Sequence, residues 1–174
     1  CQNKHVGNAP YRVDHVGSFL RPKELVEARE KFSKGELSQE ELTKVEDKVI
    51  AELVEKQIAN GLKGVTDGEF RRAYWHLDFF WGLNGVEHVQ GEKGYPFKGI
   101  ETKPDTAKVS GKISGENHPF VAHYKFLRDL VADKEGVTVK LTIPSPSQLY
   151  FELIRTEDHI KGYEKFYPTF EELK

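Results

Sequence analysis

The sequence predicts an α/β protein, namely the amino-terminal part of a (βα)8 barrel (the TIM-barrel fold) interrupted by a glycine-rich hairpin excursion. A helical pattern over residues 38–60 lies between two strand patterns, and a strand–helix–strand unit implies parallel strands. A second helix and a further strand follow over residues 118–143. A complete barrel needs about 250 residues, so residues 1–174 are interpreted as a single incomplete barrel segment. A doubly wound sheet that begins in the same way is the alternative.

The first predicted elements are a short strand and a short helix. Residues 11–20, YRVDHVGSFL, indicate a strand that runs into a turn at Gly17 and Ser18. Pro22 suits the first turn of a helix, and Gly35 ends that helix. One side of it is expected to carry Leu25, Ala28, Arg29 and Phe32.

The next helix has the clearest pattern in the chain. Ser38 and Glu41 have the spacing of a capping box, in which each side chain bonds to the backbone N–H of the other residue. An apolar stripe at helical spacing follows and consists of Leu42, Val45, Val49, Ile50, Leu53, Val54 and Ile58. Asn60 and Gly61 provide the stop, and residues 62–69 then predict the next strand.

A hairpin-rich insertion is expected at residues 82–118, which carry seven glycines. A helix is predicted to begin at His118 and Pro119. Residues 137–143 then alternate apolar and polar side chains. This alternation fits either a half-exposed strand or a barrel strand whose polar side points inward to a site. A further helix is expected near residues 148–155.

The two ends of the sequence bear on completeness. The chain begins at Cys1 and contains no methionine, so a trimmed or tagged amino terminus is expected rather than a lipidated cysteine. Thr169 and Glu172 have capping-box spacing, and Lys174 ends the chain after barely one turn. Because so short a helix is unstable in isolation, we expect this sequence to be the front part of something longer.

Composition limits the classes of function. With 26 Lys and Arg against 28 Asp and Glu, the formal net charge is −2, which gives no basic field for nucleic acid. No apolar run approaches the ~20 residues that a membrane span needs. A single cysteine excludes a disulfide framework or a cysteine-based metal cluster within the chain, and it favours a reducing, cytoplasmic location.

Charged residues crowd the stretch VTDGEFRR at residues 65–72, at the end of the predicted strand. If the strand continued through Asp67 and Glu69, both side chains would point the same way, about 7 Å apart. In parallel α/β folds the site lies at the carboxyl ends of the strands. Asp67 and Glu69 are therefore candidate functional residues, and Arg71 and Arg72 are expected to support them. A structural ion-pair network is the alternative.

A second candidate group lies where the first strand ends. His15, Gly17 and Ser18 occupy its carboxyl-terminal turn, where backbone N–H groups and a hydroxyl can hold a carboxylate. His15 is expected to form hydrogen bonds in the wall of the site rather than to act as an acid–base catalyst. Ser145 and Ser147 follow the third strand and either line the same mouth or simply shape a rigid loop.

Three motifs, DHVGSFLRP, GLKGVTDGEFRR and LTIPSPS, resemble successive motifs of the cobalamin-independent methionine synthase family, most of all its shorter, single-barrel members. The resemblance runs along nearly the whole chain and covers only the amino-terminal part of the family fold, a (βα)8 barrel. It implies a methyltransferase of methionine biosynthesis that moves a methyl group from 5-methyltetrahydrofolate, or a related donor, to homocysteine. It also implies a zinc ion (Zn2+) that holds the homocysteine sulfur as a thiolate.

The resemblance assigns roles to individual residues. Gly17 and Ser18 would hold the carboxylate of homocysteine, and Glu69 would bind its ammonium group. Asp67 and His15 are adjacent candidates for the same substrate site. Members of the family hold zinc with His, Cys and Glu or Cys residues on later strands, so no metal ligand is expected in this chain. The chain by itself is therefore expected to bind zinc poorly and to be inactive.

Three alternatives stay open. One is a related zinc-dependent thiol alkyltransferase with another acceptor. Another is a hydrolase that uses Asp67 and Glu69 as an acid–base pair, which needs one raised pKa and a water between the carboxyl groups. The last is a non-catalytic fragment, in which unpaired barrel strands would promote self-association.

Overall fold

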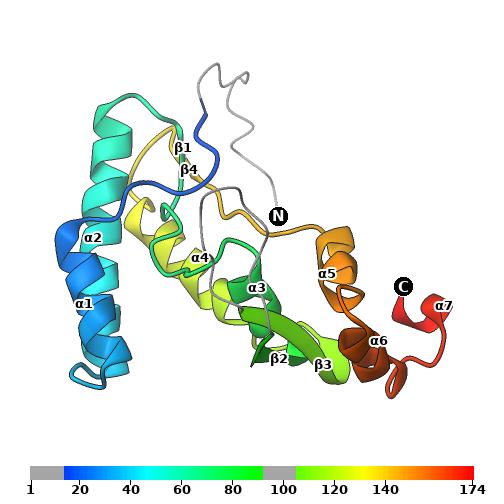
Figure 1. Cartoon of the computed structure of the whole chain (residues 1–174). Helices are drawn as coiled ribbons and strands as arrows, with labels where there is room; N and C mark the ends of the chain where they lie inside the picture. Colours follow the sequence, from blue (N-terminus) through cyan, green and yellow to red (C-terminus); the bar gives the residue numbers. More distant parts are fainter. Residues whose placement is uncertain (1–13, 92–104) are drawn as a thin grey trace, which may run out of the picture. The chain divides into compact units, whose positions relative to one another are not determined.

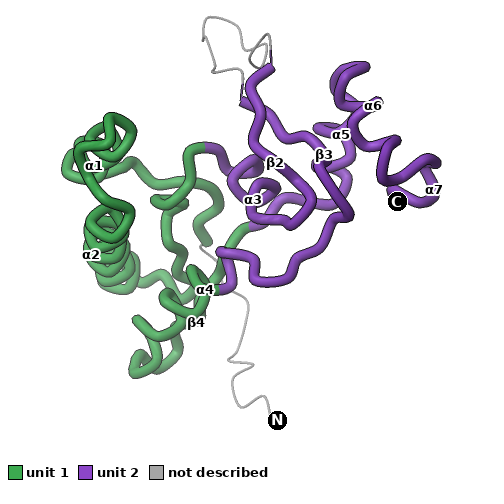
Figure 2. Tube along the Cα trace, turned by 90° about the horizontal axis from the view of Figure 1, so that it is seen from below, with its two compact units in different colours: residues 1–73, 122–142 green, residues 74–121, 143–174 purple. Residues whose placement is uncertain are grey.

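The computed structural model describes residues 14–91 and 105–174. The chain forms two compact units (Figure 2), each built from two stretches of sequence. Unit 1 contains the chain up to Ala73 and then Ala122–Thr142, whereas unit 2 contains Tyr74–Val121 and Ile143–Lys174. Each unit has its own hydrophobic core. All of the candidate site residues fall in unit 1, namely His15, Gly17, Ser18, Asp67 and Glu69.

Unit 1 combines helices with one short pair of parallel strands. Its elements (Figure 1) are α1 (Lys23–Ser33), α2 (Gln39–Ala59), β1 (Gly64–Val65), β4 (Thr138–Val139) and most of α4 (Pro119–Leu130). In the strand pair, Gly64 lies opposite Thr138 and Val65 lies opposite Val139. The pairing joins the end of the predicted strand–helix–strand unit to the third predicted strand.

The helices of unit 1 begin and end where the sequence predicts. Ser38 accepts the N–H of Glu41 and the Glu41 side chain accepts the N–H of Ser38, which confirms the capping box of α2. Gly61 has a φ of 83°, as a helix stop requires. The core consists of Leu25, Val49, Ile50, Leu53, Val54, Val65, Phe70, Leu127 and Val131. The helix α2 therefore buries most of its predicted stripe. The helix α1 buries Leu25 and Ala28, whereas Phe32, which is expected on the same side, is 39% exposed.

Unit 2 is built around an antiparallel hairpin. The strand β2 (Asn84–Gln90) pairs with β3 (Asp105–Ser114), and both lie within residues 82–118, where the sequence indicates an insertion. The remaining elements are α3 (Leu77–Trp81), α5 (Pro146–Leu153), α6 (Glu157–Glu164) and α7 (Phe170–Leu173). The core combines helix and hairpin residues, namely Leu77, Phe80, Val86 and Ala107. The helices α3 and α6 are additional to those that the sequence predicts.

The strand predicted over residues 62–69 is wrong in its length. The structure limits it to β1, because the chain turns after Val65. The side chains of Thr66 and Asp67 accept backbone N–H groups two residues further on, and such bonds compete with strand pairing. Asp67 and Glu69 therefore lie outside the strand, and the expectation that their side chains point the same way along it does not apply.

Other parts of the predicted architecture differ or stay predictions. The strand expected over residues 11–20 has no counterpart from residue 14 onward, and residues 11–13 lie outside the described part of the chain. Across residues 14–91 and 105–174, β1–β4 is the one parallel pair, so the structure is mixed α/β and the barrel stays a prediction. A single barrel segment over residues 1–174 also stays a prediction. None of the described helices combines the length and apolar character that crossing a bilayer requires.

Candidate functional site

The stretch with the candidate acidic residues folds as a tight turn. Asp67 Oδ1 accepts the N–H of Glu69 at 2.9 Å, and the Thr66 hydroxyl accepts the N–H of Gly68 at 3.1 Å. Gly68 and Glu69 both have positive φ, at 66° and 59°. A glutamate in this left-handed region is strained, and such strain is concentrated at functional sites. Asp67 therefore shapes the turn that presents Glu69.

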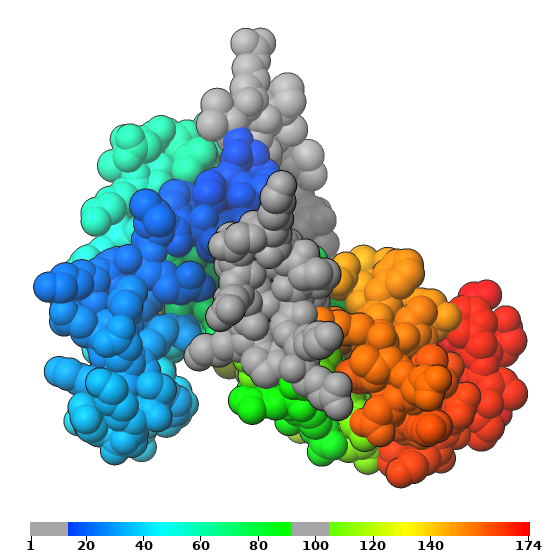
Figure 3. All heavy atoms as spheres, viewed as in Figure 1, coloured from blue at the N-terminus to red at the C-terminus, as the bar shows by residue number. Residues whose placement is uncertain are grey.

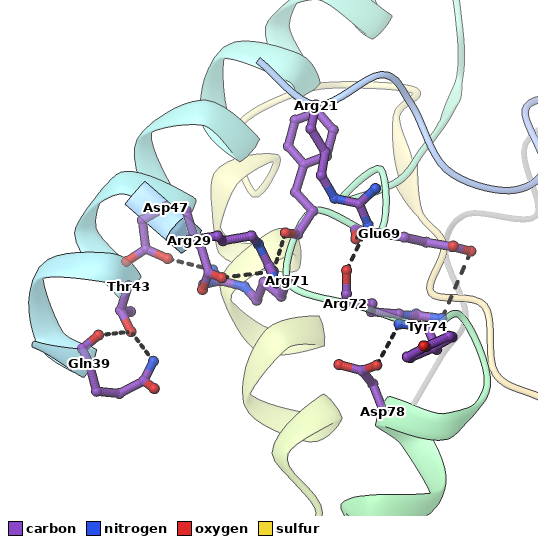
Figure 4. A network of polar contacts seen from close by, with 12 residues as sticks. Arg21, Arg29, Gln39, Thr43, Asp47, Glu69, Arg71, Arg72, Tyr74 and Asp78 are labelled. Atoms are coloured by element: carbon purple, nitrogen blue, oxygen red, sulfur yellow. Dashed lines mark hydrogen bonds and ion pairs between the residues drawn. The ribbon is translucent and has the colours of Figure 1, made fainter. Parts of the chain in front are cut away.

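The carboxylate of Glu69 is buried and is held through one of its two oxygens. Glu69 is 7% exposed. Its Oε1 accepts the hydroxyl of Thr142 at 3.0 Å and lies 3.9 Å from Nη1 of Arg72. From the described residues, Oε2 receives no hydrogen bond. The Glu69 side chain points to the opposite side of the turn from Arg29 and Arg71 (Figure 4). One acceptor oxygen is thus available to another group.

Arg71 is used to hold the turn against α2 rather than to meet Glu69. Its guanidinium pairs with Glu46 at 3.1 Å and also with Asp47 (Figure 4), and Arg29 reaches the other oxygen of Glu46 at 3.1 Å. Burial raises the pKa of Glu46 above its ordinary value, and the two nearby guanidinium groups oppose that rise. This network explains part of the charge crowded into residues 65–72. Arg71 therefore fits the alternative of a structural ion-pair network rather than the prediction that it partners Asp67 or Glu69.

The segment with the glycine–serine turn is tied to the acidic turn by a backbone hydrogen bond. The Phe19 N–H donates to the carbonyl of Gly68 at 3.2 Å. Gly17 has a φ of 92°, a conformation that glycine adopts without steric cost. Ser18 is exposed, and its segment lies at the surface of unit 1 (Figure 3). The structure therefore places the two candidate motifs next to each other, with Ser18 adjoining the residue that makes the bond.

His15 and Lys140 fix the shape of the same segment. The His15 ring stacks on Phe19 with centroids 3.8 Å apart, and its Nε2 lies 2.9 Å from the carbonyl oxygen of Gly17. Lys140 donates to Asp14 at 2.6 Å and also to the His15 carbonyl. The hydrogen bond from Lys140 lowers the pKa of Asp14. His15 thus contributes hydrogen bonds and packing to the segment, as the sequence predicts.

The polar side chains of the third predicted strand contact both motifs. Lys140 meets the segment that contains Gly17, and two residues later Thr142 donates its hydroxyl to Glu69. Arg72 in turn donates to the Thr142 carbonyl at 2.6 Å. The strand predicted over residues 137–143 is wrong in its length, since the structure limits it to β4, and Lys140 and Thr142 reach the two motifs from the segment after that strand.

Three further residues hold this arrangement, and the sequence does not single them out. Lys140 and Thr142 could have been found from the alternation, since they occupy its polar positions. Arg21 donates to the carbonyls of Glu69 and Arg72 at 3.2 and 2.6 Å, and no local pattern identifies it. These carbonyl groups belong to residues 48 and 51 positions away, so the residues next to Arg21 in the sequence give no indication of its role.

Ser145 and Ser147 shape a loop in unit 2. The Ser145 hydroxyl accepts the N–H of Gln148 and caps α5, and it lies 2.8 Å from the hydroxyl of Ser147. These contacts fit the rigid-loop interpretation.

The described residues do not provide a zinc site. In the two described ranges, no three His, Cys, Asp or Glu side chains come close enough together to hold a metal ion. Cys1 lies outside these ranges. The residues described therefore do not fit the metal that the sequence resemblance implies.

Two curated proteins of Bacillus subtilis (strain 168) are similar to the chain in sequence. The uncharacterized protein YxjH is 46% identical over 143 residues, which cover 82% of this chain and 37% of YxjH. The uncharacterized protein YxjG is 42% identical over 153 residues, which cover 88% of this chain and 40% of YxjG. The chain thus spans about two fifths of the length of these relatives. No family model matches it.

Solved structures point to a named class of enzyme. The "Putative Vitamin-B12 Independent Methionine Synthase" from Listeria monocytogenes is 37% identical with a TM-score of 0.67, over 95% of this chain and 49% of that one. A B12-independent methionine synthase from Shewanella sp. W3-18-1, in complex with selenomethionine, is 23% identical with a TM-score of 0.51, over 67% of this chain and 33% of that one. The second likeness concerns the fold alone. The chain is therefore similar to one part of cobalamin-independent methionine synthases.

Proposed function

We propose that the protein containing this chain transfers a methyl group from 5-methyltetrahydrofolate, or a related donor, to the thiol of homocysteine, giving methionine. The observation that carries the proposal is the buried carboxylate of Glu69, which lies on a turn bonded to the Gly17–Ser18 segment. Among the described residues, only one of its two oxygens accepts a hydrogen bond. The similarity to proteins named as methionine synthases supports the same reaction class. Homocysteine and the methyl donor are the proposed partners, and a cytoplasmic location stays a prediction.

Homocysteine is a zwitterion, so its recognition needs an anion and a set of hydrogen-bond donors side by side. In the proposal, Oε2 of Glu69 accepts from the substrate ammonium group. The backbone N–H groups and the hydroxyl at Gly17 and Ser18 donate to the substrate carboxylate. This role accounts for the charges of VTDGEFRR that the pairing of Arg71 leaves unexplained. Asp67 and His15 act indirectly, since the first shapes the turn and the second shapes the glycine–serine segment.

The reaction forms a bond between the thiol sulfur and the methyl carbon and breaks the bond between that carbon and the donor nitrogen. The thiol proton is transferred, net, to the donor. A zinc ion would favour the thiolate form of homocysteine, but the described residues do not fit a zinc site, so its ligands would come from elsewhere in the protein. The contribution of this chain is to bind and orient the amino-acid end of the substrate.

A hydrolase that pairs Asp67 with Glu69 is less well supported. The Asp67 carboxylate accepts the backbone N–H of Glu69, and the Glu69 carboxylate accepts from Thr142. Each acid is thus committed to a different group, and one of these bonds maintains the turn itself. Another thiol with the same amino and carboxylate groups would make the same contacts with the site. The test below therefore includes binding of such a thiol as a second outcome.

Calorimetry with homocysteine tests the proposal on the full-length protein. The variant Glu69→Gln keeps the size of the side chain and removes its charge, and it should weaken binding by roughly tenfold to a hundredfold, because a charge-assisted bond is lost. Glu55→Gln, on the exposed side of α2, is the matched control and should bind like the wild type. Unchanged affinity in Glu69→Gln would remove Glu69 from the site. Wild-type binding of another amino thiol, but not of homocysteine, would assign a different acceptor.

A further inference from the structure

The Thr142 hydroxyl stands between a buried cation and the candidate site carboxylate. Arg72, which is 2% exposed, donates through Nη2 to the Thr142 carbonyl at 2.6 Å and through Nη1 to the Thr142 hydroxyl oxygen at 3.4 Å. The same hydroxyl lies 3.0 Å from Oε1 of Glu69. One guanidinium, from the turn that carries Glu69, thus contacts both the carbonyl oxygen and the hydroxyl oxygen of Thr142.

These contacts fix the direction in which the hydroxyl proton points. A hydroxyl has one proton to donate, and guanidinium nitrogens only donate. Because the Thr142 oxygen accepts from Arg72, its own proton is directed to Glu69. Oε1 of Glu69 is consequently occupied, and the position of the carboxylate is set by a donor from the segment after β4 rather than by its own flexible side chain.

We propose that Thr142 and Arg72 are positioning residues that hold Glu69 so that Oε2 alone is presented to an ammonium group. This inference rests on the proposed function and deepens it by naming the determinant of selectivity for amine-bearing acceptors. A carboxylate that is fixed in advance binds without first losing rotamer freedom, so its selectivity for an ammonium group depends on the hydroxyl that fixes it. The left-handed backbone of Glu69 adds to this constraint, since it limits the directions in which the side chain can leave the turn.

The test compares two ligands on variants of the full-length protein. The ligands are homocysteine and 4-mercaptobutanoate, which has the same thiol and carboxylate but no amine. Thr142→Val removes the hydroxyl at nearly constant volume, whereas Thr142→Ser keeps it. Thr142→Val should reduce the ratio of the affinity for homocysteine to that for the desamino ligand by roughly tenfold. Thr142→Ser should keep this ratio at the wild-type value. If Thr142→Val does not fold, Thr142→Ala provides the same comparison.

Combining Thr142→Val with Glu69→Gln separates positioning from general damage. With the carboxylate already replaced, the second substitution should leave the ratio of the two affinities unchanged. If Thr142→Val lowers the affinities for both ligands equally, or changes neither affinity, the positioning role is wrong. The proposed function is then still tested separately by Glu69→Gln. If the wild type does not distinguish the two ligands, both proposals are wrong.

Discussion

The buried polar network of unit 1 is built on guanidinium–carboxylate pairs, whereas that of unit 2 adds a histidine to such a pair. In unit 1 two of the buried acids, Glu46 and Glu69, lie beside guanidinium groups. Glu46 contacts Arg29 and Arg71, each at 3.1 Å, and Glu69 lies beside Arg72. These pairs join α1, α2 and the turn after β1, and the candidate site is part of the same arrangement.

In unit 2 the buried acid Glu152 lies 3.4 Å from Nη1 of Arg155, and the network around it also includes a histidine. Thr106 contacts the carboxylate of Glu152 and lies 3.3 Å from Nε2 of His159, whose Nδ1 bonds to the hydroxyl of Thr156. The residues come from β3, α5 and the start of α6, so the network connects the hairpin to the helices that follow it.

This difference predicts which unit should change in stability with pH. Arginine stays protonated throughout the accessible range, whereas histidine changes charge close to neutrality. The guanidinium groups that hold the candidate site are therefore expected to keep their charge from neutral to mildly acidic solution. The stability of unit 2 is expected to depend on pH in that range, because burial lowers the pKa of His159 below that in the unfolded chain. Substitutions can test both expectations.

The largest effect is expected for Arg71→Met. The Arg71 side chain is 7% exposed and that of Glu46 is 8% exposed, so the substitution leaves a buried carboxylate with one partner fewer. It should lower the free energy of unfolding by about 3–5 kcal/mol. Urea denaturation followed by far-ultraviolet circular dichroism measures this loss.

Lys48→Met is the matched control, because it removes a cation from an exposed ion pair that joins α1 and α2. Lys48 contacts Glu24 at 2.7 Å, but the two side chains are 59% and 43% exposed. Its loss should cost far less than the loss of Arg71, because water screens an exposed pair. If both substitutions cost the same, burial would not be what distinguishes the network of unit 1.

Local patterns predict the helices of unit 1 but not the contacts that complete the site. The capping box of Ser38 and Glu41 and the apolar stripe of α2 depend on residues within a few positions of one another, so the sequence identifies them. The bond between Thr142 and Glu69 joins residues 73 positions apart, and only the folded chain brings them together.

The strand predicted over residues 62–69 is too long, and the sequence contains a local signal for its earlier end. Asp followed by Gly is a turn signal, and it occurs at Asp67-Gly68 inside the segment interpreted as a strand. The apolar residues before it, including the fully buried Val65, favoured continuing the strand through this signal. The positive φ of Glu69 is harder to foresee, since glutamate rarely adopts it and the surrounding fold must enforce it.

A smaller loss is expected for Gly68→Ala, which tests the strained turn in unit 1. Gly68 has a φ of 66°, and a Cβ atom there would lie 2.5 Å from Cδ2 of Leu53. The backbone cost and the overlap together should lower the free energy of unfolding by about 2–3 kcal/mol. Circular dichroism during urea denaturation measures it.

Gly61→Ala is the control for this substitution. Gly61 also has a positive φ, of 83°, but a Cβ atom there would have nothing within 4 Å. It should cost only the backbone term, about 1–2 kcal/mol. An equal loss in both variants would mean that Leu53 moves aside freely and that the turn is not tightly packed.

The smallest effect is the response of unit 2 to acid. Burial lowers the pKa of His159, an effect that the charge of Glu152 opposes, and the nearby charges of Arg155, Asp158 and Lys108 act in addition. Because the folded pKa lies below the ordinary value of 6.5, the unfolded chain binds more protons in mild acid. The stability from this group is thus present above about pH 6.5 and falls as the pH is lowered. One such histidine changes the free energy of unfolding by at most about 1.4 kcal/mol per pH unit.

The tryptophans allow this response to be measured separately, because both Trp75 and Trp81 belong to unit 2. Urea unfolding followed by tryptophan fluorescence should show a midpoint that falls between pH 7 and pH 5. His159→Gln should make that fall shallower, whereas His15→Gln, in unit 1, should leave it unchanged. His76 is buried with a lowered pKa in the same unit, so part of the slope should survive in His159→Gln. A slope that His15→Gln removes, and His159→Gln does not, would assign the acid response to unit 1 and contradict the contrast between the two networks.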